Sequence, residues 1–437
     1  MRTPPHIPHL RWEIGVLLGF GVLINYFDRV NLSVAAPQLQ KVFHLGPADI
    51  GLLLGAFFWS YALLQIPIGV VLDRFGVKPI GRWGAFLWSL ASTLTAISSG
   101  FGGILASRVI LGIAEAPGFP ASSKATGYWF PRSERALATA VFDAAAKFSN
   151  VIGVPFVAVI VVTYGWRWGF GLTAILSFLY FLAFFAWYRN PSEHPGLTAM
   201  ERDYIAAGGA TPEGVAETSP FAALGYLLRQ AKVWGATIGF AAYGYSFYLF
   251  LAWLPGYLVR TAHMDILKSA AYTAIPWSVA TVTDLVVGGW LIDHLIALGR
   301  EETHVRKWVL VTGMVFGLAV IGAALTRDTR WAIFWISMAL GGLAAAAPVG
   351  WSIPSLIAPK GEVGTVGGIM NFANNLMGAV APTVTGFIVG ATQSFANAFA
   401  AAGAVLLIGI FSYVVVLGKI EPIPEAEAAG GRPARGR

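Results

Sequence analysis

The sequence predicts an all-α integral membrane protein in which twelve transmembrane helices form two pseudo-symmetric six-helix bundles. Three observations support this fold class. Among the 437 residues, 56% are apolar and only 12% are charged, whereas about a quarter of the residues in a soluble domain are charged. Twelve apolar runs follow one another, each close to the roughly 20 residues that a membrane helix needs. A short motif after the second run recurs after the eighth, which indicates duplicated halves.

Apolar runs of about 18 residues or more locate the candidate spans. They lie near 13–34, 50–72, 81–99, 103–123, 136–162, 168–187, 233–258, 268–292, 308–326, 331–350, 363–390 and 395–417. The first run is longer than the core of a signal peptide, and no small-residue cleavage site follows it. We therefore expect it to be retained as a membrane span.

A polar stretch separates the two groups of six runs. It contains several prolines, acids and a Gly-Gly pair, a composition that is typical of a linker. The end of the chain is rich in Pro, Ala, Gly and Arg and is expected to be disordered. The predicted domains are an N-terminal six-helix bundle at 1–187, a cytoplasmic linker at 188–232, a C-terminal six-helix bundle at 233–418 and a disordered cytoplasmic tail at 419–437.

The positive charges indicate how the chain crosses the membrane. With the N-terminus inside, the inner segments hold 20 Lys and Arg residues and the outer segments hold 6. Because cytoplasmic loops carry the excess of Lys and Arg, both termini are predicted to lie in the cytoplasm. The net charge of +7 therefore reports topology. No basic, aromatic-rich soluble module is present, so we expect the lipid bilayer, and no nucleic acid, as a partner.

The repeated motif is typical of a conformational latch. A Gly and an Asp four residues later follow the second span, and the same pair stands 220 positions further on, after the eighth. Asp73 can accept hydrogen bonds from a helix N-terminus or an arginine, and its basic neighbours can meet acidic partners or lipid phosphates. The candidate latch residues are Gly69, Asp73, Arg74, Gly76, Lys78 and Asp293. The alternative is that these are solvated loop charges that only orient the chain.

Ionisable residues within predicted spans are costly unless they are paired or face a cavity. There are seven: Asp28, Arg29, Arg108, Glu115, Asp143, Lys147 and Asp284. Arg108 and Glu115 lie about 10 Å apart along one helix face. With Asp28 they can form a relay in which protonation of one acid releases the arginine to another. The alternative is a static cluster of buried salt bridges that fixes helix packing.

Span 5 carries an acid and a base four residues apart, Asp143 and Lys147. This spacing allows an intrahelical pair. Either the two charges neutralise each other, or Asp143 keeps Lys147 charged as a second cationic contact for an anionic substrate. No partner is predicted for Asp284, and the roles of all three residues stay open.

Neutral polar residues in the spans are further candidate substrate contacts. Tyr61 and Gln65 share a face of span 2. Asn371 with Asn374 or Asn375 can present an amide face in span 11 to a hydroxyl-bearing substrate. Such residues also serve as hydrogen-bonding links between membrane helices, which is the alternative interpretation.

The motif after span 2 resembles the Gly-x-x-x-Asp-Arg-x-Gly-Arg-Lys pattern of the major facilitator superfamily, with Val77 in place of a basic residue. Other strings are similar to those of its anion:cation symporter family, whose bacterial members carry hexuronates, galactonate, glucarate, tartrate and phthalate. These strings are Ile24-Asn25-Tyr26-Phe27-Asp28-Arg29-Val30-Asn31-Leu32-Ser33 and the segments 61–67, 108–120, 129–131, 253–258 and 367–382.

This resemblance implies the major facilitator fold and proton-coupled uptake of an organic anion, a sugar acid or other small carboxylate, through the bacterial inner (plasma) membrane. It assigns anion binding to Arg29, with contacts from Tyr61 and the asparagine cluster. It assigns proton coupling to Asp28 and Glu115, with Arg108 linked to them. Many sugar-acid carriers have small or amide residues in span 5, so Lys147 leaves a dicarboxylate or an aromatic carboxylate open as substrate.

We therefore expect a monomeric secondary transporter that works by alternating access, with the proton as coupling ion and no cofactor or metal. An antiporter that exchanges two anions is the main alternative, and a non-transporting membrane sensor is another. An enzyme is not expected, because the sequence has no phosphate-binding loop, no His-Glu-x-x-His and no histidine within a span. The absence of cysteine excludes disulfides and thiol catalysis.

Overall fold

The computed structural model describes residues 8–131, 134–210, 213, 224–326, 328–359 and 363–424. All regular structure in this part of the chain is helical. Eleven helical segments in it are long and apolar enough to cross a membrane. The helix at the position of the third predicted span, α3 (Val77–Ile97), has 21 residues. It is therefore about 31 Å long, which matches the thickness of the hydrocarbon core.

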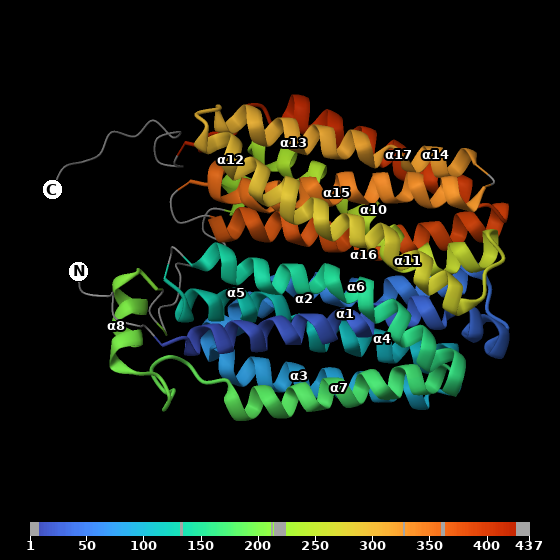
Figure 1. Ribbon diagram of the computed structural model, residues 1–437, viewed down its shortest axis with the longest axis horizontal. Helices are drawn as coiled ribbons and strands as arrows, with labels where there is room; N and C mark the ends of the chain where they lie inside the picture. The colour runs from blue at the N-terminus through green and yellow to red at the C-terminus, as the bar shows by residue number, and fades with distance from the viewer. Residues whose placement is uncertain are drawn as a thin grey trace, which may run out of the picture. The chain divides into compact units, whose positions relative to one another are not determined.

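The first half of the chain follows the predicted order of spans (Figure 1). Its helices are α1 (Leu10–Phe43), α2 (Pro47–Phe75), α3, α4 (Phe101–Glu115), α5 (Gly118–Trp129), α6 (Arg135–Tyr164) and α7 (Trp166–Trp187). The fourth predicted span is divided between α4 and α5. Pro117 lies at this division, where its missing N–H removes a helical hydrogen bond. Between α2 and α3, Gly76 has a φ of 79°, which glycine adopts without steric cost.

The second half repeats this order, with irregularities in three spans. Its helices are α10 (Ala231–Thr261), α11 (Ile266–Thr283), the π-helix η1 (Asp284–Leu291), α12 (Ile292–Ala297), α13 (Glu302–Gly317), α14 (Val320–Leu325), α15 (Thr329–Ile357), α16 (Val363–Thr392), α17 (Phe395–Phe411) and the π-helix η2 (Ser412–Val416). The eighth span thus changes from α-helix to π-helix and back. Long π-helical stretches are rare and often mark functional positions.

Contacts divide the chain into two compact units. The first consists of Met1–Leu45, Trp59–Ala216 and Asp265–Ala271, and the second of Gly46–Phe58, Glu217–Met264 and Tyr272–Arg437. In the first unit α1 packs against α6, and α3 packs against α4 and α7. In the second unit α10 packs against α16, and α13 packs against α15 and α17. The same span pairs therefore meet in both units, which agrees with duplicated halves.

Glycines in the first turns of α2 allow a close helix contact within the second unit. A Cβ on Gly51 would lie 2.8 Å from the carbonyl oxygen of Pro382, and one on Gly55 would lie 2.3 Å from Oγ1 of Thr383. Both neighbours belong to α16. Small residues four apart let membrane helices approach until their backbones touch. A larger side chain at either glycine would force α2 and α16 apart.

The predicted linker contains two helices, α8 (Ala199–Ala207) and α9 (Leu224–Leu227). Figure 1 shows α8 beside the beginning of α1. There Arg11 Nη1 donates to Glu201 Oε1 at 3.0 Å, and Arg11 Nε donates to Glu134 Oε2 at 2.7 Å. Tyr204 of α8 also donates to Glu134. The hydrogen bonds from Arg11 and Tyr204 lower the pKa of Glu134 below its ordinary value. The linker is therefore anchored to the first unit.

The first residues of the predicted tail also make contacts. Glu421 accepts from Lys232 Nζ at 3.0 Å, and the N–H of Ile423 donates to the carbonyl of Ile357 at 2.8 Å. Ile423 is buried. Residues 419–424, which the sequence places in a disordered tail, thus pack on the second unit. Residues 425–437 lie outside the described part of the chain.

Candidate transport site

An ion pair between two spans is buried inside the first unit. Arg29 lies on α1, and Glu115 is the last residue of α4, next to the break at Pro117. Arg29 Nε donates to Glu115 Oε2 at 3.3 Å, and the two side chains are 3% and 0% exposed. Each of these buried charges depends on its partner, because an unpaired buried charge is costly. Any anion that binds Arg29 must therefore compete with Glu115.

Two tyrosine rings hold the Arg29 guanidinium. Its central carbon lies 4.6 Å from the centre of the Tyr26 ring and 4.9 Å from that of Tyr61. Such cation–π contacts orient a planar guanidinium. Gln65 Nε2 donates to the carbonyl of Tyr61 at 3.4 Å. Tyr61 and Gln65 thus share a helix face, as their spacing predicted, and Tyr61 contacts the arginine.

Asp28 occupies a separate pocket made of neutral donors. Its Oδ1 accepts from Ser92 Oγ at 2.8 Å, and its Oδ2 accepts from Ser177 Oγ at 2.9 Å and from Trp88 Nε1. Trp88 and Ser92 are one turn apart on α3, and Ser177 lies on α7. Three donors stabilise a carboxylate without a charged partner. The described hydrogen bonds to the Asp28 carboxylate thus come from uncharged side chains.

Arg108 is linked to Asp28 through the main chain. Its Nη1 donates to the carbonyl oxygen of Asp28 at 3.2 Å. Spacing on one helix face links Arg108 with Glu115, and the structure adds a hydrogen bond to Glu115 from Arg29, which reaches it from another helix. The four predicted residues are thus linked within the first unit, and the relay among Asp28, Arg108 and Glu115 stays a prediction.

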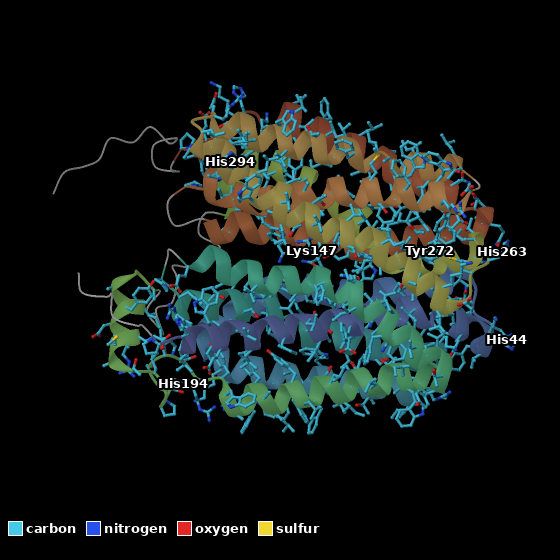
Figure 2. The ribbon with its side chains drawn as sticks, in the orientation of Figure 1. His44, Lys147, His194, His263, Tyr272 and His294 are labelled. Atoms are coloured by element: carbon cyan, nitrogen blue, oxygen red, sulfur yellow. The ribbon has the colours of Figure 1, made fainter. Side chains whose placement is uncertain are left out.

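The fifth span places one further cation in the first unit. Lys147 lies near the middle of α6 and is buried (Figure 2). The side chain of Asp143 lies outside the described part of the structure, so the predicted Asp143–Lys147 pair stays a prediction. Asp284 is buried at the first position of the π-helix η1.

Asn371 and Asn375 of α16 are hydrogen-bonded inside the second unit. Asn375 Nδ2 donates to Asn371 Oδ1 at 2.7 Å, and Tyr248 OH donates to Asn375 Oδ1 at 3.1 Å. Oδ1 of Asn374 is buried and accepts no hydrogen bond from the described residues. It lies against Gly244 of α10, where an added Cβ would be 2.1 Å away.

Part of the predicted latch can be described. Lys78 Nζ donates to Glu193 Oε2, at the start of the linker, which lowers the pKa of Glu193. Arg74 is exposed, with its guanidinium 5.4 Å from the centre of the Phe75 ring. Nothing can be assigned to Gly69, Asp73 and Asp293, whose side-chain positions lie outside the described residues. The latch role stays a prediction.

Several residues of the site had no place in the sequence analysis. Trp88, Ser92 and Ser177 surround Asp28, and Tyr26 contacts Arg29. A weak signal was present, since Trp88 and Ser92 put two hydrogen-bond donors four residues apart on one helix. Serines and tryptophans are common in membrane helices, however, so spacing alone does not distinguish them.

Buried ion pairs and polar side chains inside two repeated bundles of membrane-spanning helices define a multi-pass membrane protein of the transporter class. The chain belongs to the major facilitator superfamily, whose sequence profile matches residues 18–303. This confirms the predicted fold class and family. A solved bacterial homolog of the human lysosomal transporter Spinster, in an inward-facing and occupied conformation, has the same fold. Its TM-score is 0.75 at 18% identity, and the match covers 94% of this chain and 97% of that one.

The chain is similar along nearly its whole length to curated bacterial transporters. The uncharacterized transporter YybO of Bacillus subtilis is 43% identical, with 95% of this chain and 96% of that one covered. The probable galactarate/D-glucarate transporter GudP of Escherichia coli is 34% identical, with 96% of each covered. The D-galactonate transporter of Escherichia coli is 31% identical, with 93% and 96% covered. Fold and relatives are those of membrane transporters of the sugar-acid group, and not of enzymes.

Proposed function

We propose that this protein is a proton-coupled symporter that takes up a sugar acid or another small carboxylate by alternating access. It works in the bacterial inner membrane with both termini in the cytoplasm, as the excess of inner positive charge favours. The proton is its coupling ion, and no cofactor takes part. One chain contains both halves, so a monomer is sufficient.

The observation that carries this proposal is the buried contact between Arg29 and Glu115. While Glu115 is ionised, it occupies the guanidinium. A proton taken from outside neutralises Glu115 and frees Arg29 donors for a substrate carboxylate, which suits the planar guanidinium in a bidentate geometry. When the proton leaves on the inner side, Glu115 binds Arg29 again and displaces the anion. In both states Arg29 faces one negative charge, so no charge is left buried alone.

Asp28 supplies a second proton-accepting position. The described hydrogen bonds to its carboxylate come from the neutral side chains of Trp88, Ser92 and Ser177. Arg108 touches the main chain of Asp28 and can respond to a change at this residue. Asp28 and Glu115 can each carry a proton, which allows more than one proton per substrate molecule.

The substrate class follows from the polar groups and the relatives. The relatives are named for galactarate, D-glucarate and D-galactonate, which are polyhydroxylated acids. Arg29 suits the carboxylate, and the amides of Asn371, Asn374 and Asn375 suit the hydroxyl groups. Lys147 is a further buried cation of the first unit, in addition to Arg29 and Arg108, and as a contact for a second carboxylate it would suit the aldaric acids.

Purified protein in liposomes that contain a pH-sensitive dye tests the proposal. Addition of galactarate, D-glucarate or D-galactonate should acidify the interior as the substrate enters. Arg29→Ala should lower uptake by about 100-fold or more, because losing the partner of a buried charge costs about 3–5 kcal/mol. Arg167→Ala is the matched control, since Arg167 donates to the carbonyl of Ser98 away from this site. Uptake without acidification would indicate anion exchange and refute symport.

A further inference from the structure

A cavity lies inside the first unit, apart from the face of Arg29 that meets the tyrosines. It is lined by α1, α3, the junction of α4 and α5, and α7, and it offers about 50 Å³ to water-sized molecules. One water needs at least about 10–15 Å³ by this measure. Most of the lining is apolar, and the polar residues that line it include Asn25, Glu115 and Ser122. The cavity therefore has room for a few waters.

Two buried acceptors at this cavity have no hydrogen-bond donor among the described residues. They are Oε1 of Glu115 and Oδ1 of Asn25. Both residues are almost completely buried, with exposed fractions of 2% for Glu115 and 5% for Asn25. A buried polar atom without a partner costs about 1–3 kcal/mol, and ordered water in a cavity is the usual remedy. Both atoms therefore indicate a hydrated cavity.

The two carboxylate oxygens of Glu115 thus have different surroundings. Oε2 accepts from Arg29, while Oε1 is left for the cavity. A proton can then leave or reach Glu115 on the side opposite to the arginine, without crossing the place where a substrate carboxylate would bind. The charged groups acting on Glu115 are Arg29 and Asp28 from α1 and Arg108 from α4.

The lining residues give the cavity a direction. It runs along α3 from Trp88 to Val77, the first residue of that helix, and along α7 to Phe184 near its end. Eleven residues of α-helix extend about 16 Å. The turn between α2 and α3 lies at this end, and the charge bias assigns it to the cytoplasm. The cavity therefore leads from Glu115 toward the cytoplasmic end of the bundle.

We propose that this cavity holds a chain of water molecules that carries the proton from Glu115 toward the cytoplasm, within the first unit and separate from the substrate's path. The inference rests on the proposed symport. In the release step the O–H bond of protonated Glu115 breaks and the proton passes to the adjacent water. That water hands on one of its own protons, and the carboxylate returns to Arg29. No other reactant is required.

A direct test compares two tryptophans in the intact protein. Hydroxyl radicals generated from water by brief X-ray exposure modify side chains that touch bound water. Trp88 is 5% exposed and lines the cavity, whereas Trp129 is 0% exposed and does not line it. We expect Trp88 to be modified at least about ten times faster than Trp129. Equal rates for the two would mean a dry cavity and would overturn the proposal.

A larger side chain at the margin of the cavity tests the role of the water in transport. Gly118 is exposed and lines the cavity, and a Cβ at this position would meet no atom within 4 Å, so a leucine fits there without displacing a neighbour. Gly118→Leu should slow proton-driven uptake about ten-fold, which corresponds to about 1.4 kcal/mol in activation free energy. Exchange of labelled for unlabelled substrate, which needs no net proton release, should be retained. Gly171→Leu is the matched control, because a Cβ there also meets no atom within 4 Å but lies outside the cavity.

Asn25→Leu gives a second variant of similar size that removes one acceptor for water. It should slow proton-driven uptake and spare exchange in the same way, and both variants should reduce the modification of Trp88. If both keep the uptake rate of the unmodified protein, the water chain is refuted. If the unmodified protein moves substrate but no proton, the proposed symport fails instead, and the modification of Trp88 still reports on the water.

Discussion

Replacing Glu115 by its neutral isostere tests the competition for Arg29. Glu115→Gln keeps the shape of the side chain but imitates its protonated form at every pH. In the unmodified protein at alkaline pH, a substrate anion has to displace the ionised Glu115 from Arg29. In the variant nothing has to be displaced, so substrate binding should become nearly independent of pH. Net accumulation driven by a proton gradient should be lost.

The expected size of this effect follows from the ion pair. At 3.3 Å and an effective dielectric constant of about 20, two unit charges attract by about 5 kcal/mol. Desolvation offsets much of this attraction, and a hydrogen bond between charged groups contributes about 1.5–3 kcal/mol net. At alkaline pH, Glu115→Gln should therefore bind substrate about 10- to 150-fold more tightly than the unmodified protein. At acidic pH the two affinities should converge.

Calorimetric titration of the purified proteins at several pH values measures these affinities. The ligand is whichever of galactarate, D-glucarate and D-galactonate raises the melting temperature, since a ligand of the folded state stabilises it. Glu302→Gln serves as control, because Glu302 forms an exposed pair with Arg306 on α13. A Glu115→Gln protein that keeps the pH dependence of the unmodified affinity would refute the competition.

Three further predictions concern other parts of the structure. Ser177→Ala removes one donor to Asp28 and should slow proton-driven uptake about ten-fold, since hydrogen bonds to charged groups contribute about 1.5–3 kcal/mol. Gly55→Leu should lower stability in a thermal melt by about 1–3 kcal/mol, because it overpacks the contact with α16. Arg11→Ala should destabilise by about 3–5 kcal/mol near neutral pH by breaking a buried ion pair. The pKa of Glu134 is lowered in the folded protein. The stabilisation that Glu134 contributes is therefore fully present above about pH 4.3, the ordinary pKa of a glutamate, and is lost as the pH falls through the lowered pKa.

Each of these predictions has an outcome that would contradict it. Uptake by Ser177→Ala at the unmodified rate would show that this hydroxyl does not support Asp28. Gly100→Leu is the control, because its added Cβ would meet no atom within 4 Å, and it should melt at the same temperature as the unmodified protein. If Gly55→Leu also melted at that temperature, the close contact between α2 and α16 would be refuted. The difference in stability between Arg11→Ala and the unmodified protein should become smaller in acid. If it does not, Glu134 does not contribute to the stabilising effect of Arg11.

The sequence was sufficient for the fold class because long apolar runs and the positive-inside bias are direct consequences of the bilayer. Pro117 was expected to break or bend the span at 103–123, and the structure divides that span between α4 and α5, but the π-helix that begins at Asp284 was not predicted. These depend on which hydrogen bonds the neighbouring helices permit. The sequence also missed α8, whose anchoring depends on Arg11 and Glu201, far apart in the chain.

For the site, the sequence identified the charged residues but not their partners. Asp28, Arg29 and Glu115 stand out because charges in apolar spans are rare. The indole of Trp88 and the hydroxyl of Ser177 cost little in a membrane helix, so nothing in their composition or spacing marks them as ligands of Asp28. Only the packing of α3 and α7 against α1 brings these donors to the carboxylate.

The anchoring of α8 determines where the polypeptide can be divided. By position α8 belongs to the connection between the halves, but Arg11 and Glu201 join it to the first unit. A break before residue 199 would put these two residues on different polypeptides, whereas a break after residue 210 keeps them on one. Two separately expressed half-transporters should therefore be divided after residue 210. A fusion partner inserted at that point leaves the ion pair within its own half.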